Sequence, residues 1–112
     1  MGYKRPQRTI SVTFDDSTEF GGWWFRANSV PVEKFLEMRR SDAYLLKSWA
    51  EQVTEWNLED DDGNPIPVSK DAVMGLDATH VRSSAMAWYN AISRIIDPKA
   101  PPPPLEALAD LA

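Results

Sequence analysis

The sequence predicts an α+β fold in which an N-terminal β-hairpin precedes a small helical domain with two long and two short helices. Three observations support this fold class: an alternating apolar pattern near the N-terminus, two later segments with apolar residues every three or four positions, and Pro- and Gly-containing breaks between them. A chain of 112 residues has room for one hydrophobic core. We therefore expect a single α+β domain over residues 1–97, followed by a separate C-terminal segment over residues 98–112.

The hairpin is predicted near the N-terminus. Residues 9–14 alternate strictly between polar and apolar side chains, which is typical of a half-buried strand. Residues 15–17 have turn chemistry, the Gly21-Gly22 pair breaks regularity again, and the aromatic segment 23–27 predicts a second strand. Two strands alone are only marginally stable in water. The hairpin should therefore pack on helices or pair with the sheet edge of another chain.

Two helices are expected next. Pro31 suits a first helical position and predicts a short helix to about residue 39. Ser41 or Asp42 is a good N-cap for a longer helix that ends near Trp56. The spacing of its apolar residues predicts a stripe facing the core. The stripe consists of Leu45, Leu46, Trp49, Val53 and Trp56.

A polar break and two further helices complete the predicted domain. The Asp-Gly and Asn-Pro pairs of residues 57–67 favour a turn-rich connection. Ser69 should cap a short helix, residues 71–74, that Gly75 ends. Asp77 or Thr79 should begin the last long helix, which runs to Pro98 with an apolar stripe at Val81, Ala85, Trp88, Ile92 and Ile95. Because each long helix places a tryptophan on its apolar face, we expect the two helices to pack together.

The C-terminal segment differs in composition from the domain. Pro98 and the run 101–104 predict a semi-rigid polyproline II spacer. Beyond it, Leu105, Leu108 and Leu111 would share one face of a two-turn amphipathic helix, which is too short to be stable without a binding partner. A frayed terminus is the alternative, since chain ends are often disordered.

Charge and composition exclude several classes of partner. The net charge of −5 is uneven: residues 1–40 carry seven Lys/Arg against five Asp/Glu, and residues 41–112 carry five against twelve, so the halves are +2 and −7. An acidic half repels phosphates, so we expect no nucleic-acid partner. The basic residues near the N-terminus are solvated or contact an acidic partner. No apolar run could span a bilayer, and no membrane association is expected.

The sequence offers little catalytic chemistry. Cysteine is absent and His80 is the only histidine, so a nucleophile would depend on that one residue, with Ser83 and Ser84 on the same helix and no glycine-rich elbow. The acidic run before Gly63 does not have the spacing of an EF-hand calcium loop. If Gly63 were the sixth residue of such a loop, the first ligand would be Leu58 and the last Ser69, and neither side chain carries the required carboxylate. No phosphate-binding glycine motif occurs. We expect no enzyme activity, no cofactor and no metal site.

The aromatic residues of the hairpin, like the C-terminal leucines, are expected to contact a partner protein. Consecutive aromatic residues on a strand point to both faces, so one face can enter the core while the other remains exposed. We selected Trp23 and Phe25 as partner-binding residues, together with Leu105, Leu108 and Leu111, because the core requires these large apolar residues least. A second covered core face is the alternative interpretation for the aromatic pair.

Residues 56–67 carry a resemblance to a known family. The segment WNLEDDDGNPIP is similar to tail assembly chaperones of long-tailed phages, particularly those of actinobacterial hosts, which likewise have Trp-Asn-Leu, an acidic turn with Gly, and two prolines. The resemblance continues to the Trp-Tyr-Asn-Ala-Ile segment at residues 88–92 and covers roughly residues 8–98. Its physical interpretation is a solvated acidic turn anchored by apolar residues at both ends: Trp56, Leu58 and Ile66.

The resemblance implies a non-catalytic chaperone in the host cytoplasm that binds the tape measure protein and the tail tube protein during tail morphogenesis. Homo-oligomer formation is compatible with this role. The alternative is a structural virion component, a connector or minor tail subunit, that assembles by strand addition at the hairpin edge.

Overall fold

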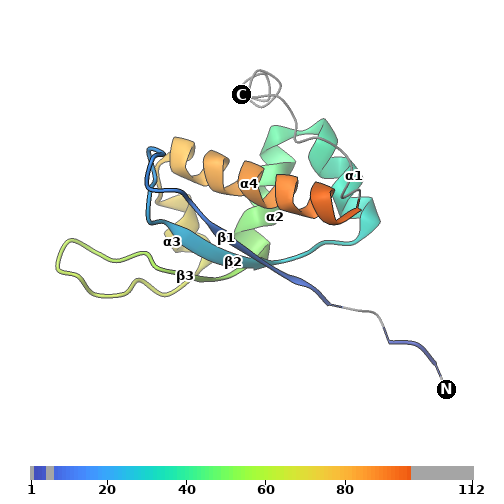
Figure 1. Cartoon of the computed structure of the whole chain (residues 1–112), viewed down its shortest axis with the longest axis horizontal. Coiled ribbons are helices and arrows are strands. Elements are labelled where there is room, and N and C mark those ends of the chain that lie inside the picture. The colour runs from blue at the N-terminus through green and yellow to red at the C-terminus, as the bar shows by residue number, and fades with distance from the viewer. Residues whose placement is uncertain (1, 5–6, 97–112) are drawn as a thin grey trace.

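The computed structural model describes residues 2–4 and 7–96, and it confirms the α+β class. A three-stranded antiparallel sheet of order β1-β2-β3 carries helices on one face (Figure 1). The elements are β1 (Thr9–Thr13), β2 (Trp24–Asn28), α1 (Val32–Arg40), α2 (Asp42–Gln52), β3 (Val53–Trp56), α3 (Lys70–Met74) and α4 (Ala78–Ile96). The predicted spacer and tail, residues 98–112, lie outside the described residues.

The N-terminal hairpin is confirmed. β1 and β2 pair in a regular register from Thr9 opposite Asn28 to Thr13 opposite Trp24. The connecting loop depends on its glycines, because a Cβ at Gly21 would lie 2.6 Å from the Cα of Asp16 and Gly22 has a φ of +87°. Backbone with positive φ favours glycine, since a Cβ would meet the neighbouring carbonyl.

The prediction that the second helix continues to Trp56 is wrong. α2 ends at Gln52, and residues 53–56 form β3, which pairs antiparallel with β2. Val53 and Trp56 are three positions apart, and this spacing predicts a helix in a sequence. In the structure both side chains are buried on the same face of a strand, because a β-bulge places one extra residue between them.

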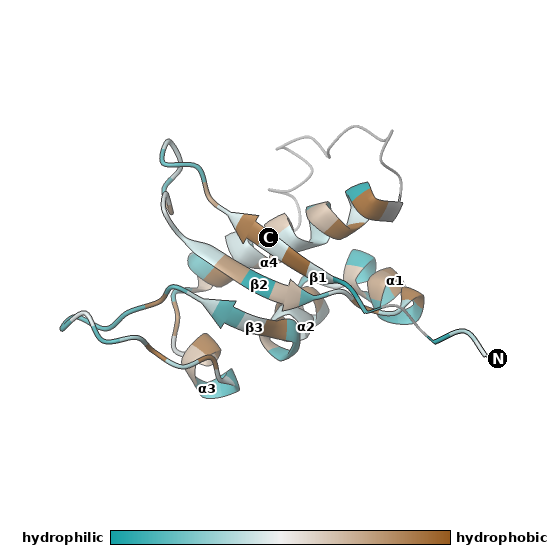
Figure 2. Cartoon of the chain, turned by 60° about the horizontal axis from the view of Figure 1, so that its bottom comes forward, coloured by the Kyte–Doolittle hydropathy of each residue, from teal (hydrophilic) through white to brown (hydrophobic). Residues whose placement is uncertain are grey.

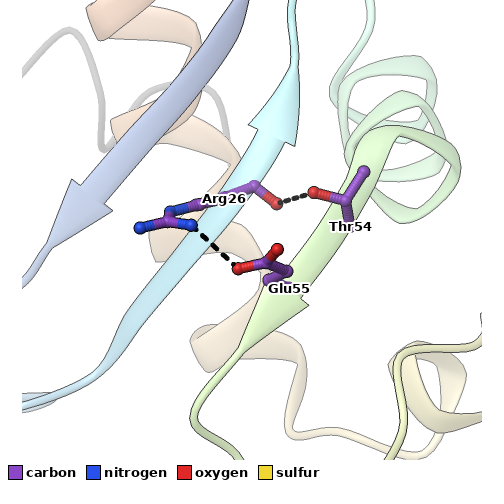
Figure 3. Close-up of polar contacts among 3 residues, drawn as sticks. All are labelled: Arg26, Thr54 and Glu55. Carbon is purple, nitrogen blue, oxygen red and sulfur yellow. Dashed lines mark hydrogen bonds and ion pairs between the residues drawn. The ribbon is translucent and has the colours of Figure 1, made fainter.

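The bulge lies opposite the middle of β2. Trp56 is paired with Phe25 and Glu55 with Arg26, but Ala27 is paired with Val53, so Thr54 has no partner in the ladder. Its hydroxyl donates instead to the carbonyl of Arg26 at 3.2 Å, and the Arg26 guanidinium forms a 3.0 Å ion pair with Glu55 (Figure 3). These exposed contacts support the irregular section of the sheet.

The predicted helix starts agree with the structure to within one residue. The Ser41 hydroxyl accepts a hydrogen bond from the Tyr44 amide at the start of α2, and Ser69 caps α3 in the same way. Gly75 ends α3 as expected. α4 begins one residue after Asp77, whose carboxylate accepts from the Thr79 amide at 2.7 Å.

One core lies between the sheet and the helices. The two long helices, α2 and α4, pack together as predicted, and their tryptophans Trp49 and Trp88 are fully buried. From β3 the chain enters a loop, residues 57–69, that projects from the body (Figure 1). Within residues 2–4 and 7–96, no helix has both the length and the apolar character needed to cross a membrane.

Candidate protein-interaction surfaces

Trp23 and Phe25, selected from the sequence as contact residues, belong to the core. Their exposed fractions are 7% and 0%. The Phe25 ring meets the Trp49 ring edge to face at 5.3 Å, and the Trp23 indole N–H donates to the Ser84 hydroxyl at 2.9 Å. The alternation of β2 turns Phe25 toward the helices, and Trp23 lies on the same side. Neither side chain is presented to a partner in this structure.

Trp24 is the aromatic residue that faces outward. It is half-buried on the outer face of the sheet, where the Arg26 guanidinium lies 5.9 Å from its ring centroid. The rest of that face is polar, and no helix of the described residues lies over it (Figure 2). The remaining three residues predicted from the sequence, Leu105, Leu108 and Leu111, lie outside the described residues.

The exposed apolar side chains of α1 form a second candidate surface. Val32 and Leu36 are 71% and 48% exposed and lie one helical turn apart, so they share a face. Between them, the half-buried Phe35 stacks on Tyr89 of α4, with ring centroids 5.2 Å apart. We call Val32 and Leu36 the α1 pair. Their spacing in the sequence indicates an apolar helix face, but only the packing reveals that no described element covers this face.

The free edge of β1 forms a third candidate surface. The Arg8 carbonyl accepts a hydrogen bond from the Ser29 amide, and the Phe14 amide donates to Trp23. Even-numbered residues of β1 therefore direct their backbone groups toward β2. The amides and carbonyls of Thr9, Ser11 and Thr13 point the other way, and no other described residue bonds to them.

A shallow hollow lies beside this edge, between β1 and α4. It is lined by Ser11, Val12, Thr13, Ala87, Asn90, Ala91 and Arg94. The short side chains of Ala87 and Ala91 leave this space between α4 and β1. The buried side-chain oxygen of Asn90 has no hydrogen-bond partner among the described residues. Val12 and the two alanines supply the apolar part of the lining.

His80 and Ser84 are held in structural contacts. The His80 ring stacks on Phe20 at 4.8 Å and meets Trp23 edge to face at 4.5 Å. Burial lowers the pKa of His80 from its ordinary value of 6.5, although the nearby Asp77 carboxylate partly offsets this effect. Ser84 is fully buried; its hydroxyl accepts from Trp23 and donates to the carbonyl of His80. The hydroxyl is thus not presented to a substrate.

The acidic turn is anchored as the sequence predicts. The Trp56 indole N–H donates to the carbonyl of Ile66 at 2.6 Å, and the Ile66 amide donates to Leu58. At the exposed tip, the Asp60 carboxylate accepts from the backbone amides of Asp62 and Asn64. Within the described part of the chain, no group of three or more His, Asp or Glu residues is arranged to hold a metal ion.

Comparisons with protein families, with curated proteins and with solved structures find no match to this chain. The function is therefore inferred from the α1 pair, the free edge of β1 and the anchored acidic turn. The first two are candidate surfaces for other proteins, and the third carries the resemblance described above.

Proposed function

We propose that this protein is a phage tail assembly chaperone that acts in the host cytoplasm, without catalysis, by binding the tape measure protein and tail tube subunits. The observation that carries the proposal is the exposed α1 pair, two large apolar side chains on one helix face that no described element covers. The resemblance of residues 56–67 supplies the identity of the partner. The arrangement of Trp56, Leu58 and Ile66 agrees with the anchored turn predicted from the apolar and polar character of these residues.

The α1 pair suits a helical partner. Val32 and Leu36 lie one turn apart beside the Phe35–Tyr89 stack, so an amphipathic helix could place its own apolar residues against them. Full burial of a Val or Leu side chain contributes about 1.5–3 kcal/mol. A tape measure protein has long hydrophobic helices that need such cover before assembly. In this proposal Leu105, Leu108 and Leu111 add a second contact of the same kind.

Binding without catalysis is supported by the polar groups of the core. The Ser84 hydroxyl already accepts one hydrogen bond and donates another. The His80 ring is packed between Phe20 and Trp23. Neither group lies in the hollow beside β1. His80 and Ser84 are thus used to hold α4 against the hairpin.

Co-expression with a tape measure protein from the same phage tests the proposal. The chaperone should raise the soluble yield of the long protein and co-elute with it. Leu36→Lys should abolish co-elution because it places a charge in the apolar contact, with little change in folding stability. Met74→Lys is the matched control, since Met74 is a 60% exposed apolar residue on a different helix, α3. If the tape measure protein is equally soluble alone and no complex forms, the proposal is wrong.

A structural virion component is the second candidate, and the free edge of β1 favours it. A subunit that assembles by strand addition needs an accessible edge with unpaired backbone groups. Mass spectrometry of purified virions discriminates the two functions. A structural subunit is present in stoichiometric amount, whereas a chaperone is absent from the finished particle.

A further inference from the structure

We propose that β1 pairs antiparallel with β1 of a second copy of this chain, about a two-fold axis at Ser11, to form a dimer with a continuous six-stranded sheet. This inference rests on the free edge of β1 and the charges beside it, and it holds whether or not the protein is a chaperone. The occupant of the edge is a second copy because the edge is complementary to itself in both hydrogen bonding and charge.

The hydrogen-bonding groups match only in certain registers. Thr9, Ser11 and Thr13 direct their amides and carbonyls outward. In an antiparallel pair centred on Ser11, Thr9 lies opposite Thr13 of the second copy and Ser11 opposite Ser11. Each of these pairs exchanges two hydrogen bonds. Every outward group of the strand then has a partner, and the hydroxyl side chains lie across from one another on the outer face.

β1 lacks the features that normally protect a sheet edge. All five of its residues are uncharged, none is proline, and its pairing with β2 is regular. β3, the strand at the opposite edge of the sheet (Figure 2), has two such protective features. It is interrupted by the bulge at Thr54, and it carries the charged Glu55. A head-to-tail ring would need β1 to pair with this irregular edge, whereas a two-fold dimer uses β1 alone.

Charges on either side of β1 are complementary in the same register. Continued past the strand, the register places Gln7 opposite Asp15 of the second copy and Arg8 opposite Phe14. The basic Arg8 of one copy then lies diagonally across from Asp16 of the other, and the two-fold axis repeats the contact. Both side chains are exposed. Arg8 thus gains an acidic partner within the dimer.

The hollow beside β1 provides room for the second copy. Five residues of edge pairing bury far less than the roughly 1,200 Å² of a stable interface, so helices must also contribute. Ser84 bonds to Trp23 near one end of β1, and Trp88 donates to Asn28 near the other, so α4 runs along this strand. Its small residues Ala87 and Ala91 face the hollow and allow the second α4 to approach.

Disulfide trapping tests the pairing, because the chain contains no cysteine. Opposed residues of an antiparallel pair are about 5.5 Å apart at Cα, which a disulfide can bridge. Ser11→Cys should cross-link into a covalent dimer under mild oxidation, and Thr54→Cys on the opposite edge is the matched control. Thr9→Cys and Thr13→Cys should cross-link when mixed but not singly. Equal cross-linking of Ser11→Cys and Thr54→Cys, or of Thr9→Cys alone and in the mixture, overturns the proposal.

A charge exchange tests the complementarity in solution. Arg8→Glu and Asp16→Lys should each weaken the dimer by at least about tenfold in sedimentation equilibrium, because each brings like charges together. An equimolar mixture of the two variants should recover the affinity. In the heterodimer the two substituted side chains, one acidic and one basic, attract each other in one contact, and the native Arg8 and Asp16 meet in the other. A wild-type protein that stays monomeric at the highest soluble concentration, or a mixture that shows no recovery, overturns the proposal.

Discussion

Three consecutive aromatic residues show how position decides the role of a side chain. Phe25 is fully buried against Trp49, and Trp23 is almost as buried and bonds to Ser84. Trp24, between them in sequence, lies on the outer face of the sheet beside Arg26. Three side chains of similar size therefore have different roles: Trp23 and Phe25 stabilise the core, whereas Trp24 forms part of the outer surface.

Alanine substitutions should separate these contributions. We expect Trp23→Ala and Phe25→Ala to lower the free energy of unfolding by about 3–5 kcal/mol, because each leaves a cavity in the core. Trp24→Ala should cost about 1 kcal/mol or less, since its side chain is partly in contact with solvent. Urea unfolding followed by far-UV circular dichroism measures all three. Equal losses for Trp23→Ala and Trp24→Ala would contradict the assignment of Trp23 to the core.

His80 should make stability depend on pH. Its pKa is lowered in the folded state by burial, so below its ordinary value of 6.5 the unfolded chain binds a proton more readily than the folded one. Stability is therefore highest above pH 6.5 and falls as the pH drops from there through the folded pKa. His80→Phe keeps a ring against Phe20 and Trp23 but removes the titration. The unfolding free energy of the wild type should fall more steeply from about pH 7.5 to 5 than that of the variant; parallel curves would show that His80 is not the titrating group.

At the scale of elements, β3 shows where apolar spacing misleads. Val53 and Trp56 continue the stripe of α2, but the backbone of Val53 is already extended, with φ −65° and ψ 133°. The ladder with β2 decides the outcome, because it provides hydrogen bonds and a buried face at the same residues. A bulged strand and a helix both place positions i and i+3 on one face, so a single sequence does not distinguish them.

The hairpin loop depends on a close approach at Gly21. A Cβ there would lie 2.6 Å from the Cα of Asp16, whereas at Gly75 the nearest atom, the carbonyl oxygen of Asp71, is 3.6 Å away and φ is negative. We expect Gly21→Ala to reduce the free energy of unfolding by about 1–3 kcal/mol. Gly75→Ala, the matched control, should be neutral or stabilising by up to about 1 kcal/mol. Similar urea midpoints for both variants would show that the loop adjusts freely.

At the scale of the whole molecule, the described helices cover one face of the three-stranded sheet. They bury its inner side chains, and the outer face is polar apart from the half-buried Trp24. The candidate interaction surfaces lie at its edges: the α1 pair on a peripheral helix and the β1 edge beside α4. Because these surfaces are separate, a dimer through β1 leaves the α1 pair of each copy available to a partner.

The sequence by itself determined the α+β class, the hairpin, the helix starts and the anchored turn. These depend on local chemistry: strict alternation in residues 9–14, hydroxyl caps at Ser41 and Ser69, and the prolines and glycine of residues 57–67. Each signal acts within a few residues of the chain, so it is readable without the fold.

Only the tertiary structure decided which apolar residues are covered. Trp23 and Phe25 enter the core because β2 turns that face toward α2 and α4, and β3 exists because β2 offers it a ladder. Val32 and Leu36 have the spacing of a core stripe, yet no element covers them among the described residues. Burial depends on contacts with residues distant in sequence. For that reason the local pattern predicts the helices and strands of this protein better than it predicts which apolar side chains remain exposed.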